Sequence, residues 1–171
     1  MLVPRGDSPG KAVGQHVRDL QSRGKTVVFV AADRPYRHLV DAFALIGADA
    51  DRVHFIDVVS AAGGQAPIER VANALFLASP TMLEMLAMRV EQTVARLGGD
   101  THVVLDSLNT LALYNGEAPV QEFSHYLANR LRERRVPGDF IVRDGHDAAT
   151  LQSKIATFTD ARIELHARDA T

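Results

Sequence analysis

The residues with the clearest chemical potential are Asp106 and Ser107, which directly follow the apolar run 103–105. A carboxylate at the end of a buried strand, with a hydroxyl beside it, is suited to holding a magnesium ion near bound phosphates. Aspartate is also a common turn residue at the end of a strand. The pattern therefore makes Asp106 a candidate metal ligand and Ser107 a candidate binding residue, with a turn as the alternative.

A degenerate phosphate-binding loop lies near the start of the chain. Such a loop follows the pattern G-x-x-x-x-G-K-[ST], in which backbone N–H groups and the lysine bind phosphate and the final hydroxyl binds magnesium. Gly10 and Lys11 match, whereas Arg5 takes the first glycine position and Ala12 the hydroxyl position. Gly6 replaces the lost glycine in part, but Ala12 has no ligand atom. The simpler alternative for Gly10 and Lys11 is a turn followed by an exposed lysine.

Asp33 directly follows another apolar run, 26–32. At the end of a strand next to the one that carries Asp106, its carboxylate could polarise an attacking water molecule, which makes Asp33 the candidate catalytic residue. The alternative is that Asp33 caps the helix that follows.

Seven histidines are present, and none has a metal-ligand spacing such as H-E-x-x-H. His146, with Asp144 and Asp147 beside it, forms a minor candidate for acid–base or metal chemistry. Three others fall in or near expected elements and are interpreted as packed or surface residues: His16, His54 and His102.

These residues must be positioned by strands that alternate with helices. Apolar, β-branched runs predict strands, and they lie at 1–3, 26–32, 53–56, 74–78, 101–106, 140–142 and 161–165. Helical spacing predicts helices that begin near Lys11, Pro35 and Ser79 to Thr81, a further one over about 119–135, and a last one after Asp147. This order predicts an α/β fold, a three-layer, doubly wound and mainly parallel sheet. Asp33, Asp57, Asp106 and Asp144 then share the carboxyl edge, where ligands bind in such sheets.

Composition narrows the function classes. The 171 residues are 46% hydrophobic and contain no cysteine, which predicts a single domain over 1–171 without disulfides or thiolate chemistry. A formal charge of -2 gives no overall attraction to nucleic acid or to membranes. No apolar stretch has the length of a membrane span, so we expect a cytoplasmic protein without a membrane partner. Residues 2–6 either begin a truncated first strand or are the remnant of a protease-cleavable tag.

Several segments together resemble the RecA/KaiC/RadA-like ATPase superfamily. They occur in the order and near the spacing of that superfamily: VVFVAAD at 27–33, VHFID at 53–57, VVLDSLNTLALYN at 103–115 and FTDARIEL at 158–165. A closer resemblance, to small archaeal-type KaiC-like proteins, is carried by Arg34-Pro35-Tyr36, Ala62-Gly63-Gly64 and the sequence LFLASP at 75–80.

This resemblance implies a RecA-like P-loop NTPase fold, with ATP and magnesium as the cofactors. Asp106 matches the magnesium-associated aspartate of the superfamily, Lys11 its phosphate lysine, and Asp33 the position of a catalytic glutamate. Superfamily members often assemble into rings or filaments, which implies self-association or a protein partner. Arg5 and Ala12 depart from the pattern where magnesium-dependent hydrolysis needs it most.

The leading hypothesis is a RecA/KaiC-like regulatory or assembly module that is non-catalytic or binds nucleotide weakly. One alternative is a working magnesium-dependent ATPase or signalling NTPase that uses Gly6, Gly10 and Lys11. The other is a DNA-associated accessory protein that uses the basic cluster at Arg132, Arg134 and Arg135, against which the near-neutral charge counts.

Overall fold

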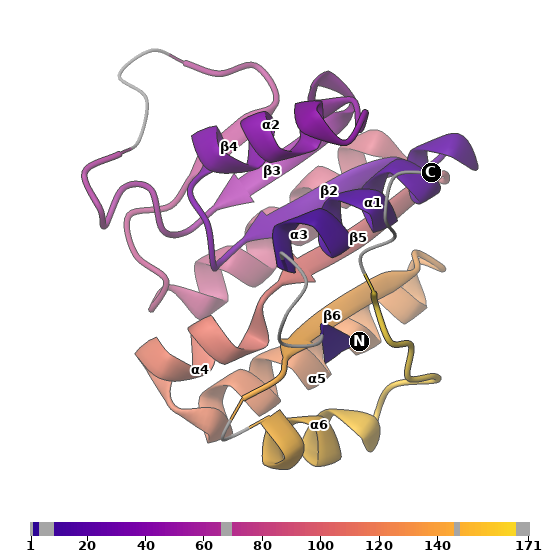
Figure 1. Cartoon of the computed structure of the whole chain (residues 1–171). Coiled ribbons are helices and arrows are strands. Elements are labelled where there is room, and N and C mark those ends of the chain that lie inside the picture. Colours follow the sequence, from indigo (N-terminus) through magenta and orange to yellow (C-terminus); the bar gives the residue numbers. More distant parts are fainter. Residues whose placement is uncertain (1, 4–8, 66–69, 146–147, 167–171) are drawn as a thin grey trace.

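The computed structural model describes residues 2–3, 9–65, 70–145 and 148–166 (Figure 1). Six parallel strands form one sheet in the order β1-β6-β5-β2-β3-β4. The strands are β1 (Leu2–Val3), β2 (Thr26–Ala31), β3 (Val53–Asp57), β4 (Ala74–Phe76), β5 (Thr101–Asp106) and β6 (Gly138–Arg143). β2 and β5 are thus central, as their unbroken apolar runs predict.

Helices cover both faces of this sheet. They are α1 (Pro9–Ser22), α2 (Tyr36–Leu45), α3 (Leu83–Leu97), α4 (Leu108–Asn115), α5 (Glu117–Glu133) and α6 (Ala148–Ala156), with a short 3-10 helix η1 (Ala50–Arg52). One hydrophobic cluster joins α1 and α2 to one face, and a second joins α3, α4, α5 and α6 to the other. The predicted three-layer, doubly wound α/β architecture is confirmed.

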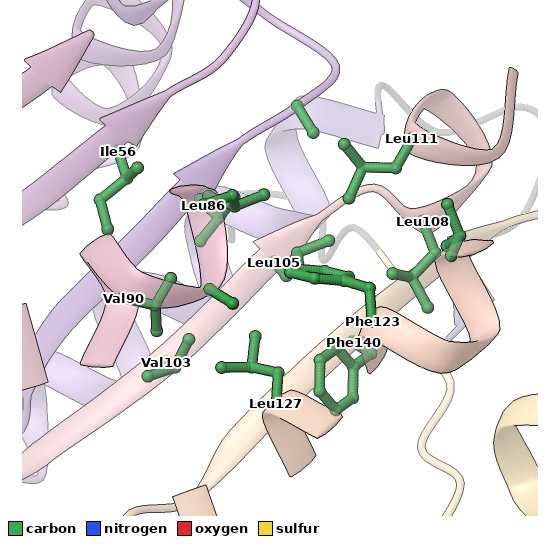
Figure 2. Packing of buried hydrophobic residues seen from close by; sticks show 14 of the residues in the cluster. Ile56, Leu86, Val90, Val103, Leu105, Leu108, Leu111, Phe123, Leu127 and Phe140 are labelled. Carbon is green, nitrogen blue, oxygen red and sulfur yellow. The ribbon is translucent and has the colours of Figure 1, made fainter. Parts of the chain in front are cut away.

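The two cores meet across single strands. In β5, Val103 and Leu105 belong to the cluster under α3 and α5, whereas Val104 between them belongs to the cluster under α1 and α2. This follows from the alternation of side chains along a strand. Figure 2 shows Leu105 lying with Phe123 and Leu127 of α5, on the face of the sheet that α3 and α5 cover. The strand residues that face either cluster are apolar because helices cover both faces of the sheet.

Some expected boundaries were wrong. The segment 161–165 is not a strand, and only Glu164 makes an isolated bridge. The side chains of 161–164 are exposed, with Ile163 at 53%, and only Leu165 packs against a core cluster, so the segment has little buried surface to hold it in a sheet. α3 begins at Leu83, and Met82 rather than Thr81 is its N-cap.

The start of α1 also differs from the expectation. α1 begins at Pro9, so Gly10 and Lys11 lie in its first turn and not in a turn before it. Proline is tolerated there because the first helical N–H groups have no intrahelical partner. The phosphate-loop residues that the structure describes are therefore at the N-terminus of a helix.

No helix in the described part of the chain is long and apolar enough to span a membrane.

Candidate functional site

The candidate site lies at the carboxyl edge of the three neighbouring strands β6, β5 and β2. Arg143 is the last residue of β6, Asp106 is the last residue of β5, and Asp33 follows β2 by two residues. Because the strands are parallel and adjacent, their carboxyl ends bring these side chains together. Asp33 and Asp106 were expected to meet here, and Arg143 was not foreseen.

Arg143 occupies both carboxylate oxygens of Asp106. Its Nη2 atom lies 2.6 Å from Oδ1 and 2.6 Å from Oδ2, and Asp106 is only 2% exposed. Burial raises the pKa of Asp106 to about 6, and the nearby Asp33 adds to this, while the Arg143 guanidinium opposes it. At pH 7 Asp106 is therefore mainly ionised and forms a buried ion pair with Arg143.

Asp33 is held by the same network. Its Oδ2 lies 3.2 Å from Nη2 of Arg143, and its Oδ1 accepts a hydrogen bond from the Thr110 hydroxyl at 3.0 Å. Asp33 does not cap α2, because Pro35 is the N-cap and makes no side-chain cap bond. Asp57 serves that helix instead, since its carboxylate accepts the N–H of Tyr36 at 2.6 Å. The cap alternative for Asp33 is thus wrong.

A second guanidinium lies at the start of α1. A Cβ atom added to Gly10 would lie 1.9 Å from Nη1 of Arg34, so this glycine leaves the space that the guanidinium fills. Arg34 Nε is also 3.8 Å from Asp33 Oδ2. Lys11 follows Gly10 in the first turn of α1 and is half-buried. Gly6, along with Arg5, lies outside the described residues.

Ser107 is fully buried, with its hydroxyl 3.3 Å from the Thr110 hydroxyl. It occupies the N-cap of α4 and makes no side-chain cap bond there. Through Thr110, Ser107 is linked to Asp33 and so to the ion-pair network. Because Ser107 is buried and reaches Asp33 through Thr110, its role at the site is structural support.

Four residues of this site were not candidates in the sequence: Arg143, Asn109, Arg34 and Thr110. The Asn109 side chain accepts the backbone N–H of Arg143 at 2.7 Å and donates to its carbonyl at 3.1 Å, which fixes the end of β6. The available signal was an arginine directly after the buried run 140–142, at the same strand end as the exposed Asp144. The proposed partners of Asp144, His146 and Asp147, lie outside the described residues.

Asp57 was expected at the ligand edge, and its role is structural. It is fully buried and accepts the N–H groups of Val59 and Ser60 and the Ser60 hydroxyl, as well as the N–H of Tyr36. Both of its oxygens are therefore used to shape the loop after β3. None of these hydrogen bonds involves Asp33 or Asp106.

The residues present do not fit a magnesium site. Magnesium needs oxygen ligands, and the carboxylate in question already binds Arg143 through both oxygens. Ala12 supplies no hydroxyl, and it is buried. Arg34 and Arg143 offset the charges of Asp33 and Asp106, so these four side chains are neutral together. What remains is a polar edge whose guanidinium groups are paired with carboxylates, beside a helix N-terminus, which favours anions.

Comparison with solved structures agrees with this fold. The chain is similar to the KaiC-like protein PH0186 of Pyrococcus horikoshii, with a TM-score of 0.58 and 16% identity over 84% of this chain and 59% of that one. It is also similar to the uncharacterized protein PH0321 of Pyrococcus horikoshii, whose structure is a complex with an unknown peptide, with a TM-score of 0.68 and 12% identity over 93% of this chain and 74% of that one. The fold is thus RecA/KaiC-like, and the chain spans about three fifths of the length of PH0186.

Sequence comparison identifies the family. Residues 3–165 match the family described as "Family of unknown function (DUF7504)", and the chain belongs to it. No curated protein matches the sequence.

Proposed function

We propose that this protein is a RecA/KaiC-like regulatory or assembly module that does not hydrolyse ATP with magnesium. The observation that carries the proposal is the ion pair in which Arg143 covers both oxygens of Asp106. A magnesium ion at this carboxylate would have to displace a buried guanidinium. Breaking a buried ion pair by removing one partner typically costs about 3–5 kcal/mol.

Nucleotide binding without magnesium is compatible with the same residues. Arg34 and Lys11 lie at the start of α1, where a helix N-terminus also attracts anions, and Arg143 shares Asp33 with Arg34. Guanidinium groups bind phosphate through paired hydrogen bonds and need no metal. Any affinity for ATP or ADP is therefore expected to be weak and independent of magnesium.

A surface for a protein partner lies on the helical layer away from this edge. α3 and α5 border a largely apolar cavity of about 700 Å³ that is lined by Leu83, Ala87, Met88, Phe123 and Tyr126 among others. Met88 and Tyr126 are 39% and 49% exposed there. An open apolar groove between two helices suits an apolar peptide segment. That the fold neighbour PH0321 forms a complex with a peptide supports a partner of this kind.

The basic cluster on α5 does not favour a DNA-binding role. Arg132 donates to the Phe158 carbonyl at 2.9 Å and pairs with Asp160 at 3.1 Å. Arg130 pairs with Glu91 at 2.9 Å, and Arg134 lies 3.7 Å from the same carboxylate. These arginines are offset by acidic neighbours and tie α5 to α3 and to the segment after α6.

Isothermal titration of ATP and ADP, with and without magnesium, combined with a phosphate-release assay, tests the proposal. We expect no turnover and a binding heat that is unchanged by magnesium. The matched variants are Asp106→Asn and Asp144→Asn, which remove a buried and an exposed carboxylate at neighbouring strand ends. Magnesium-dependent turnover that Asp106→Asn abolishes and Asp144→Asn leaves intact would overturn the proposal.

A further inference from the structure

A second group of polar side chains lies at the amino end of the sheet, opposite the candidate site. His102 and Asp139 are the second residues of the neighbouring strands β5 and β6, and His16 lies in the middle of α1, which packs over this face. The three residues are not neighbours in the sequence, and His16 and Asp139 are separated by 123 positions. Parallel pairing and the packing of α1 bring them together.

The three side chains converge on one point. Nε2 of His16 and Nε2 of His102 each lie 2.7 Å from the same carboxylate oxygen, Oδ2 of Asp139. The imidazole rings meet edge to face, with centroids 6.3 Å apart. One nitrogen from each histidine and one aspartate oxygen therefore lie within 4.8 Å of one another. A single oxygen with two imidazole nitrogens directed at it is the arrangement of a compact ligand set.

This cluster is largely buried but remains accessible to solvent. The side chains of His16, His102 and Asp139 are 17%, 12% and 20% exposed, so small ions and water have access. Burial opposes the charge of Asp139, yet the hydrogen bonds from the two histidines hold the pKa of this carboxyl well below its usual range. The carboxylate is thus ionised, as a metal ligand must be.

We propose that His16, His102 and Asp139 form a site for one divalent transition-metal ion, with zinc the best match. Zinc takes imidazole nitrogen at about 2.0–2.1 Å and carboxylate oxygen at about 2.0–2.2 Å in tetrahedral geometry. Ligand atoms so arranged are about 3.3–3.5 Å apart. Each nitrogen therefore needs to move less than 1 Å from the oxygen that it now contacts, within the reach of side-chain rotation.

The ligand types also select the metal. Two imidazoles and one carboxylate suit zinc, copper, nickel or iron better than magnesium or calcium, which prefer oxygen alone. Three protein ligands leave a coordination position for water. The site is separate from the ion-pair network of Arg143 and Asp106, and it stands whether or not the proposed function is correct.

Metal binding here would add a link between α1 and the paired strands β5 and β6. The ion would hold the middle of α1 against β5 and β6, while the first turn of α1 carries Gly10 and Lys11. Because a ligand that binds only the folded state stabilises it, the metal is expected to raise the melting temperature of the protein.

Titration of the full, untagged, EDTA-treated chain with Zn²⁺ tests this site by calorimetry and thermal unfolding. We expect one ion per chain, a raised melting temperature, and at least tenfold weaker binding in His16→Gln and in Asp139→Asn. His125→Gln, which removes an exposed histidine of α5, is the matched control and should bind like the parent. Co²⁺ should show visible absorption bands in the parent and in His125→Gln that are lost in the other two variants.

Two results would overturn the assignment. One is the absence of Zn²⁺ binding by the folded parent chain, in which case the three residues are only a hydrogen-bonded link between α1 and the sheet. The other is equal Zn²⁺ affinity in the parent and in His16→Gln. Circular dichroism of each apo variant establishes that it is folded, and glutamine at position 16 retains a hydrogen-bonding group toward Asp139.

Discussion

Arg143 links the two acidic residues at the carboxyl edge of the sheet. It contacts Asp106 through both carboxylate oxygens and lies 3.2 Å from Asp33, while Asn109 fixes its backbone. Asp106 is almost fully buried, and Arg143 is the guanidinium that contacts it, with Arg34 favouring its charge from farther away. A residue that offsets a buried charge has more influence on stability than a surface ion pair.

Replacing Arg143 by methionine is expected to lower the free energy of unfolding by about 3–5 kcal/mol, because Asp106 then remains buried without a cation. Urea denaturation at pH 7 measures this loss. The double variant Arg143→Met with Asp106→Asn should be more stable than Arg143→Met alone, since it carries no uncompensated charge. The control is Arg23→Met at an exposed arginine, which should change little. A loss of less than about 0.5 kcal/mol in Arg143→Met would contradict this account.

At the scale of elements, the approach of α1 to α2 depends on Gly14. A Cβ atom at this position would lie 2.2 Å from Cδ1 of Ile46 and 3.3 Å from Cδ1 of Phe43. Two polar contacts keep the same elements in place: Arg18 donates to the Ile46 carbonyl at 3.1 Å, and Gln21 exchanges hydrogen bonds with the backbone of Asp49. Glycine in a helix interior is unfavourable by about 1 kcal/mol relative to alanine, and the close packing explains its presence.

Gly14→Ala is expected to destabilise the protein by about 1–2 kcal/mol, because the cost of overpacking exceeds the gain in helix propensity. The change in urea midpoint measures it. Ile46→Val removes the Cδ1 atom that the new methyl group would meet. In that background the same Gly14→Ala substitution should be neutral or stabilising. If alanine is equally destabilising in both backgrounds, contact with Ile46 is not the reason for the glycine.

At the scale of the whole molecule, the sheet separates two hydrophobic clusters that share its strands. Ile56 of β3 belongs to the cluster under α3 and α5, and Ile141 of β6 belongs to the cluster under α1 and α2. Both isoleucines are fully buried. Because each central strand contributes side chains to both clusters, neither cluster can lose its packing while the sheet persists. The two should therefore unfold together.

Ile56→Val and Ile141→Val make the same deletion on opposite faces, and each is expected to lower the free energy of unfolding by about 0.5–1.5 kcal/mol. The double variant should lose the sum to within about 0.3–0.5 kcal/mol, since the sites share no partner. Denaturation followed by far-UV circular dichroism and by hydrogen exchange measures both quantities. Two separate transitions, with Ile56→Val moving only one of them, would show that the faces unfold independently.

The amino-acid sequence by itself determined the architecture and the placement of the two acidic residues of the site. The buried runs at 26–32 and 101–106 are too apolar for an exposed sheet face, which requires parallel strands covered by helices. That requirement also places Asp33 and Asp106 at one edge, because parallel strands end together. The run at 161–165 has the local pattern of a strand, but the strand predicted there does not form. Strand formation also needs a neighbouring strand and a buried face, which the local pattern does not report.

Only the tertiary structure decided which side chains meet. Arg143 reaches Asp106 across 37 positions, and His16 reaches Asp139 across 123. Periodicity tells which way a side chain points within its own element, whereas these contacts depend on which strands are neighbours and on how α1 lies over them. The strand order β6-β5-β2 places Arg143 beside Asp106, so the candidate magnesium ligand is paired with an arginine. The packing of α1 converts two histidines that have no motif into a convergent cluster with Asp139.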